Sequence, residues 1–434
     1  MSRHSVRRAS METVAVGVLA QGVLMASGIL VARLLGVENR GHLALMVLFP
    51  LILSMTGTLG LHTATTYYVV RGHDPRAVLR SVRATALRQF AVILALEAVI
   101  IAAVFGDEAT EVKVAALFSV LGLPALLMLN WGQAILQGQH RYRAYNVSRV
   151  VPPLMYSTGL VLVFVAGADD LALVTAIWAT TFLAGCSATF ADALRKAPDE
   201  GTPPPPLSEM KRFGLKGMVG WVSPLESFQL DQLFIGLALS ASDLGLYVVG
   251  AAFTNLTRVF IPQSLGVIAY PHVAAKPTRA EARRAVWRFF AAAFAVCAVA
   301  VAVLELTVGV LIPFFFGDEF EDAVVLARIL LLGSLFLGLR RVLTDGTRGA
   351  GHPGLGTLVE GLTAAVAIPA LIVTGVSYGA EGVAWAITGA YAFGLLAMVT
   401  LSLVVLRRPG PAPEGDGAAD SDAGAAEPDQ VAAA

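Results

Sequence analysis

Charged side chains are scarce in this sequence of 434 residues. Asp, Glu, Lys and Arg make up 14% of the chain and hydrophobic residues 56%, whereas a typical soluble domain contains about 25% charged residues. The mean hydropathy is +0.71. This composition excludes an ordinary soluble domain and predicts long apolar segments.

Cysteine is nearly absent, and the common nucleotide and metal motifs are missing. Cys186 and Cys297 each lie in the middle of an apolar segment, which excludes a disulfide framework and a thiolate metal site. The seven histidines show no pairing at helical spacing, and no GxxxxGK(S/T) motif occurs. We therefore expect no metal or cofactor, and no use of ATP unless a partner supplies the ATPase.

Long apolar stretches dominate what is present. A helix of roughly 20 residues crosses the hydrocarbon core of a membrane, and about twelve such stretches occur. We predict an all-α polytopic membrane protein with about twelve transmembrane helices. The stretches run approximately from Thr13 to Leu35, Leu43 to Val70, Phe90 to Phe105, Val114 to Leu136, Val150 to Val165, Leu171 to Leu194, Leu215 to Leu239, Gly245 to Tyr270, Phe289 to Pro313, Ala323 to Leu343, Leu355 to Val376 and Val383 to Leu406.

Positive charge is sorted between the connections. Most Lys and Arg residues fall on every second connection, including the one that carries Arg340, Arg341 and Arg348, whereas the intervening connections are acidic, as at Asp107 and Asp169. Short loops rich in Lys and Arg stay on the cytoplasmic side. Both termini are therefore predicted to be cytoplasmic, with a basic inner face that suits anionic lipids and gives no support for nucleic acid binding.

The chain divides into five predicted parts. Residues 1–12 form a cytoplasmic N-terminus, 13–194 an N-lobe of six helices, and 215–406 a C-lobe of six helices. Between the lobes, 195–214 contain four consecutive prolines and are predicted to be a cytoplasmic linker. The acidic tail, 407–434, cannot bury a core and is expected to be disordered.

The two lobes resemble repeats of each other. The stretch LVARLLGVENRGHLALMV in the N-lobe and LFIGLALSASDLGLYVVG in the C-lobe both contain an apolar helix, a short polar turn, a glycine and a second apolar helix. Phe-Gly-Asp-Glu also occurs at 105–108 and again at 316–319. Six helices per lobe make the repeats parallel, as in transporters with a central cleft at the repeat interface.

These stretches carry a family resemblance. ARLLGVENRGHLALM, GLHTATTYYVVRG, LDQLFIGLALSASDLGLYVVGAAF and FFFGDEFEDAVVLARIL resemble polysaccharide-biosynthesis (Wzx-like) flippases. These belong to the multidrug/oligosaccharidyl-lipid/polysaccharide (MOP) exporter superfamily, together with lipid II flippases and MATE antiporters. The resemblance implies a V-shaped transporter that moves undecaprenyl-pyrophosphate-linked oligosaccharide by alternating access in a bacterial cell membrane, without its own ATP, and with glycan polymerase machinery as a partner.

Charged residues inside apolar segments are the first candidates for substrate binding, because placing them in hydrocarbon is costly. Arg258 and Arg33 could grip a pyrophosphate, since a guanidinium donates two hydrogen bonds to one phosphate group. Alternatively, Arg33 snorkels to the outer interface, and Arg258 forms a structural ion pair with Glu226 or Asp231. Glu360 is predicted to reach Arg340 or Arg341.

Two sets of polar residues complete the candidate site. Ser223, Glu226, Ser227 and Asp231 would share one face of a continuous helix over 215–239, and Asp231 also resembles an acidic position of these flippases. Thr66 and Tyr67 could contact sugar hydroxyls, although an aromatic belt at the membrane interface explains Tyr67 equally well.

Three function classes remain open on sequence alone. The first is a flippase for a lipid-linked oligosaccharide, the second a multidrug or cation antiporter of the same superfamily, and the third an integral membrane polymerase of lipid-linked sugars. A polymerase would need a sizeable outer loop, and the outer connections here are short. We therefore expect a transporter and not an enzyme.

The charge sorting predicts the orientation in the membrane. Single cysteines placed at Asp107, Asp169 and Glu319 should react with an impermeant thiol reagent in intact cells, whereas cysteines at Arg76 and Lys211 should react only after the membrane is opened. The reversed labelling pattern would contradict the predicted orientation.

Overall fold

The computed structural model describes residues 3–195, 205–221 and 223–407, and their regular structure is entirely helical. The helices are α1 (Arg3–Thr56), α2 (Leu61–Val70), α3 (Pro75–Phe105), α4 (Thr110–Ser119), α5 (Gly122–Gly138), α6 (Tyr142–Ala166), α7 (Leu171–Arg195), α8 (Leu207–Trp221), α9 (Pro224–Ser227), α10 (Leu230–Ala238), α11 (Ala241–Ala252), the π-helix η1 (Leu256–Phe260), α12 (Ile261–Ala274), α13 (Arg279–Phe316), the 3-10 helix η2 (Asp318–Phe320), α14 (Ala323–Gly349) and α15 (Gly354–Val405).

The helical membrane architecture is confirmed. Within the described ranges, eight helical stretches are long and apolar enough to cross a membrane. Two of them, α1 and α15, each contain two predicted segments joined at a kink, where Gly36 and Gly379 adopt φ angles of 69° and 61°. Only glycine adopts these angles without a steric cost. The predicted total of twelve spans stays a prediction.

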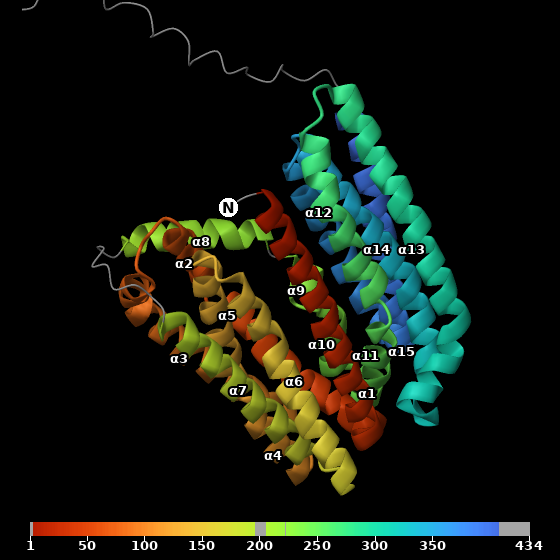
Figure 1. Cartoon of the computed structure of the whole chain (residues 1–434). Helices are drawn as coiled ribbons and strands as arrows, with labels where there is room; N and C mark the ends of the chain where they lie inside the picture. Colours follow the sequence, from red (N-terminus) through yellow and green to blue (C-terminus); the bar gives the residue numbers. More distant parts are fainter. Residues whose placement is uncertain (1–2, 196–204, 222, 408–434) are drawn as a thin grey trace, which may run out of the picture.

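Figure 1 shows two helical bundles that spread apart toward the end where the N-terminus lies and converge at the other end. The largest buried cluster of the described residues lies at their junction and includes Leu45 and Met46 of α1, Tyr247 of α11 and Leu337 of α14. The part of α1 before the kink at Gly36 does not pack on the N-lobe alone. Its Ala32 is buried in a cluster with residues of α13.

The linker region differs from its prediction. Residues 196–204, which include two of its four consecutive prolines, lie outside the described residues, as do residues 1 and 2 and most of the acidic tail, 408–434. From Leu207 the chain forms α8, which Figure 1 shows lying across the end of the N-lobe. Phe213 of α8 stacks on Tyr67 of α2, with ring centroids 4.2 Å apart. The expected boundary at 214/215 therefore falls inside a single amphipathic helix that packs on α2.

Two glycines at equivalent positions of the repeats hold the converging ends together. A Cβ atom on Gly41 would lie 1.7 Å from the carbonyl oxygen of Ala241, and one on Gly245 would lie 2.0 Å from the carbonyl oxygen of Val37. Each glycine thus faces the carbonyl four residues before the other glycine. This reciprocal contact is the kind that a two-fold axis generates, and it supports the predicted repeat.

The contact predicts opposite effects for two glycines of one helix. Gly41→Ala should lower the melting temperature of the purified protein, because overpacking at a backbone contact costs about 1–3 kcal/mol. Gly28→Ala is the matched control, since no atom lies within 4 Å of a Cβ there, and it should leave the melting temperature unchanged or raise it slightly. Equal melting temperatures for both variants would contradict the proposed junction.

Candidate functional site

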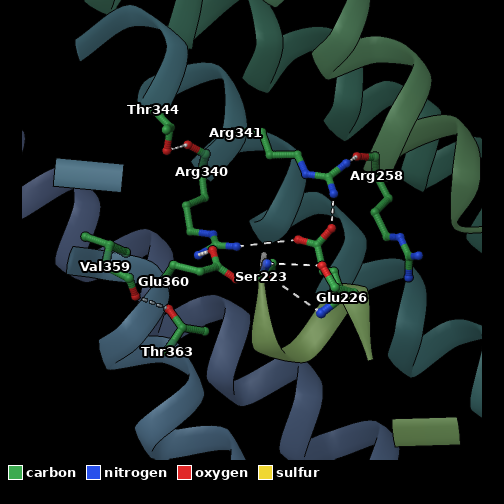
Figure 2. Close-up of polar contacts among 10 residues, drawn as sticks. Ser223, Glu226, Arg258, Arg340, Arg341, Thr344, Val359, Glu360 and Thr363 are labelled. Carbon is green, nitrogen blue, oxygen red and sulfur yellow. Dashed lines mark hydrogen bonds and ion pairs between the residues drawn. The ribbon is translucent and has the colours of Figure 1, made fainter. Parts of the chain in front are cut away.

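Five charged residues from four elements form a cluster in the C-lobe, shown in Figure 2. The Glu226 carboxylate of α9 forms ion pairs with both Arg340 and Arg341 of α14. Arg340 also pairs with Glu360 of α15, with 2.5 Å between Nη1 and Oε2. Arg341 Nη1 donates a 2.6 Å hydrogen bond to the backbone carbonyl of Arg258 in η1. The two adjacent arginines therefore join three separate helical elements to α14.

The local sequence explains the position of Glu226. Pro224 occupies the first turn of α9, where a missing N–H costs nothing, and Ser223 caps the helix by accepting from the Glu226 N–H. The Ser223 hydroxyl also donates to the Glu360 carboxylate. The serine thus starts the short helix and links it to α15.

A proline explains why the Arg258 carbonyl is available. In a regular helix, the N–H of residue 262 would bond to the carbonyl of residue 258, but residue 262 is proline and has no N–H. The chain forms a π-helix at this point, over Leu256–Phe260, a rare geometry that is frequent at functional sites. Arg341 supplies the donor that Pro262 lacks.

The arginines of the cluster differ in how they are paired and in how far their side chains are exposed. Arg340 and Arg341 face the carboxylates of Glu226 and Glu360, two charges of each sign, and the guanidinium of Arg258 lies outside these ion pairs. The Arg340 side chain is 5% exposed and that of Arg341 is 32% exposed. A guanidinium has five N–H donors, and two of those of Arg341 are used within the described residues. Arg341 can therefore donate further hydrogen bonds to an anionic ligand.

Arg258 is the least compensated charge of the cluster. Within the described part of the chain, its side chain makes no hydrogen bond or ion pair, and its buried Nε has no partner. It interacts electrostatically with Tyr247 and Tyr391. Figure 2 shows its side chain pointing away from Glu226. The structural ion pair between Arg258 and Glu226 or Asp231 is therefore not formed, and the guanidinium is available for a ligand.

The other predicted site residues have local contacts. The Asp231 carboxylate accepts a 2.7 Å hydrogen bond from the buried Tyr247 hydroxyl, and the Ser227 hydroxyl accepts from the Ser223 N–H at 3.1 Å. Thr66 donates to the Ala134 carbonyl of α5. Tyr67 lies between Phe213 and Arg71, whose guanidinium carbon is 4.4 Å from the ring centre.

Arg33 lies at the converging end of the lobes. Its exposed side chain donates to the carbonyls of Phe314 and Phe315, in the last turn of α13. A cation at a helix C-terminus satisfies carbonyls that have no partner within the helix. The predicted residues thus lie in several places, and only Arg258 and Glu226 share contacts with Arg341.

Two expectations need correction. The segment 215–239 is not one continuous helix, because it is interrupted before α9 and again at Gln229, which has a φ of 43°. Ser223, Glu226, Ser227 and Asp231 therefore do not share one helical face. Arg340 and Arg341 do not lie in a connection, since α14 continues to Gly349. The predicted pairing of Glu360 with Arg340 is confirmed.

A family model and solved structures resemble the chain. The family model described as "Polysaccharide biosynthesis protein" matches residues 30–325. No curated protein sequence matches. The structure titled "Lipid II flippase MurJ, inward closed conformation" has a TM-score of 0.72 at 13% identity, and the match covers 90% of this chain and 87% of that chain.

MATE transporters have the same fold. An inward-facing multidrug resistance MATE family transporter of the MOP superfamily gives a TM-score of 0.67 at 16% identity, with 89% of this chain and 94% of that chain covered. The MATE multidrug transporter DinF-BH gives 0.54 at 17% identity, with 93% and 95% covered. At these identities the similarity establishes the transporter fold alone.

The burial of Arg340 predicts its effect on stability. Arg340→Ala leaves Glu360 without its ion-pair partner and Glu226 with Arg341 alone, and breaking a buried ion pair costs about 3–5 kcal/mol. We expect a large fall in melting temperature and in membrane abundance. Arg348→Ala is the control on the same helix, since its pair with Asp345 is 3.8 Å long and 53% of its side chain is exposed, and it should change stability by less than about 1 kcal/mol. Similar melting temperatures for the two variants would show that the buried pairs are not structural.

Proposed function

Because the chain belongs to the polysaccharide biosynthesis protein family, we propose that it is a flippase that moves undecaprenyl-pyrophosphate-linked oligosaccharide from the inner to the outer leaflet. It is a multi-pass membrane protein with the fold of lipid II flippases and MATE transporters. The observation that carries the substrate class is the arginine cluster around Glu226, because guanidinium groups bind phosphate oxygens through paired hydrogen bonds.

In this proposal, Glu226 acts as the anionic partner of the arginines when no substrate is bound. Its carboxylate bridges Arg340 and Arg341, so it compensates their charge when no pyrophosphate is bound. Arg258, which has no ion-pair partner in the described chain, takes the pyrophosphate first, and the free donors of Arg341 add to this grip. Asp231 orients Tyr247 next to Arg258. Ser227, Arg33, Thr66 and Tyr67 stay predicted substrate contacts.

The arrangement of the lobes supports alternating access. They meet at the reciprocal contact of Gly41 and Gly245 and spread apart toward the N-terminal end (Figure 1). With both termini cytoplasmic in a bacterial cell membrane, as we propose, this arrangement faces inward. Rocking one repeat against the other would then expose the site to the outer side. Glycan polymerase machinery would receive the product.

A multidrug or cation antiporter is the second candidate. The observation that favours it is the fold shared with MATE multidrug transporters. A cation substrate would need an acidic site with free carboxylates, whereas Glu226 and Glu360 are both paired with arginine. The guanidinium of Arg258 has no ion-pair partner in the described chain and stays positive. This charge supports an anionic substrate.

Substitutions of Arg258 test the proposal in cells that lack the chromosomal gene. Arg258→Ala should lower glycan export about tenfold or more at normal membrane abundance, because it removes charge-assisted hydrogen bonds to the substrate. Arg258→Lys should restore export only in part, since an ammonium keeps the charge but loses the planar fork. Lipid-linked sugar on the inner leaflet is the quantity to measure.

Arg348→Ala, on α14 outside the cluster, is the control and should transport normally. Full export by a stable Arg258→Ala protein would remove Arg258 from the site. Increased drug susceptibility in the deletion strain, without accumulation of lipid-linked sugar, would replace the flippase with the antiporter.

A further inference from the structure

A cavity of about 560 Å³ lies in the N-lobe, away from the charged cluster of the C-lobe. Its walls come from α3, α5 and α7 and from the break between α1 and α2. Phe90, Ile93, Leu127 and Trp131 make its body apolar. Nothing in the transport proposal uses this cavity, because its walls belong to one lobe and a transported substrate has to pass between the two.

One end of the cavity is strongly basic. Arg76, Arg80 and Arg83 all line it, and their spacing of four and three residues places them on one side of α3. Arg76 donates to the carbonyl of Leu194 at 3.2 Å. Arg80 and Arg83 are exposed, and neither forms a hydrogen bond or ion pair within the ranges the structure describes. Two exposed arginines without a partner in the described residues thus line one part of an otherwise apolar cavity.

The part of the cavity from Arg83 to Ile93 matches one leaflet of a membrane. Ten residues of α3 separate Arg83 from Ile93, which corresponds to about 15 Å along the helix axis. Half of a hydrocarbon core of about 30 Å has the same thickness. A molecule with an anionic group at the arginines and an apolar chain reaching Ile93 would therefore lie as a phospholipid lies in its own leaflet.

We propose that this cavity binds one anionic phospholipid, with its phosphate between Arg80 and Arg83 and one acyl chain along α3 toward Ile93. The positive charge selects an anionic headgroup, because basic pockets between transmembrane helices attract acidic lipids. The apolar body accepts the acyl chain.

The site also contacts a break in the helices. Gly57 and Thr58 line the cavity, and the next two residues, Leu59 and Gly60, adopt φ angles of 47° and 74°. A Cβ atom on Gly60 would lie 2.1 Å from the carbonyl oxygen of Gly214 in α8. The bound lipid therefore supports the end of α1 at the point where the chain turns into α2 and meets α8.

Lipid titration of the purified, delipidated full-length protein tests the proposal by native mass spectrometry. Phosphatidylglycerol should bind at one tight site, and phosphatidylcholine should bind more weakly. The double variant Arg80→Gln/Arg83→Gln should weaken phosphatidylglycerol binding about thirtyfold, as expected for the loss of two basic contacts near a membrane surface. The control Arg283→Gln/Arg284→Gln removes two exposed arginines from α13 of the C-lobe and should not change it.

Substitutions that fill the cavity provide a second test of the lipid-binding proposal. Ala86 lines the cavity and Ala84 does not, so Ala86→Trp should reduce phosphatidylglycerol binding and Ala84→Trp should not. The arginine pair lies on the surface, and its result decides the proposal even if Ala86→Trp does not fold. Equal weakening by both arginine pairs, or equal affinity for the two phospholipids, would overturn it. So would undecaprenyl phosphate binding ten times more tightly than phosphatidylglycerol, because the cavity would then belong to the substrate.

Discussion

The reciprocal contact of Gly41 and Gly245 is the constraint on which the arrangement of the lobes depends. In a membrane, lipid tails compete with side chains for apolar surface, so helices associate through close packing of small residues. Here the absence of two side chains lets each backbone approach a carbonyl of the other lobe. The two lobes are thereby held at one end, where α1 and α11 meet, and they are free to diverge at the other.

The ion pairs of the cluster around Glu226 lie inside one lobe and do not bridge the two. Arg340, Arg341, Glu226 and Glu360 all come from α9, α14 and α15, and the contact with Arg258 adds η1 of the same lobe. Because the ion pairs do not cross between lobes, a relative movement of the lobes need not break them. The cost of burying these charges is thus met by contacts inside the C-lobe.

The membrane architecture could be predicted from sequence because it depends on averages along the chain. Hydropathy finds the apolar segments, and most of their residues lie on helix in the structure, with breaks such as the one at 57–60. The pairing of Glu360 with Arg340 was also predicted from sequence, as one of two alternatives. Glu226 as the common partner of Arg340 and Arg341 was not predicted, since α9 and α14 lie far apart in sequence and no local signal links them.

The helix breaks show where sequence patterns stop being informative. Pro224 and Pro262 mark two irregular points, but a left-handed φ at Gln229 has no sequence signature, because glycine is the residue expected there. The candidate face with Ser223, Glu226 and Asp231 required a regular helix and was lost with it. The predicted apolar stretch from Ala323 to Leu343 already contained Arg340 and Arg341, and α14 extends it to Gly349.

Arg341 connects the irregular backbone to the charge cluster. Its guanidinium donates both to the carbonyl that Pro262 leaves unpaired and to the carboxylate of Glu226. The first bond stabilises the π-helix, and the second holds the short helix α9. A ligand bound to the remaining donors of Arg341 would therefore be in contact with two broken helices at once, and its binding energy would depend on how η1 and α9 are placed. Contiguous contacts of this kind can carry coupling between a site and a conformational change. Pro262 interrupts the helix and leaves the carbonyl of Arg258 without a backbone donor, and this carbonyl then accepts the hydrogen bond that links η1 to α14.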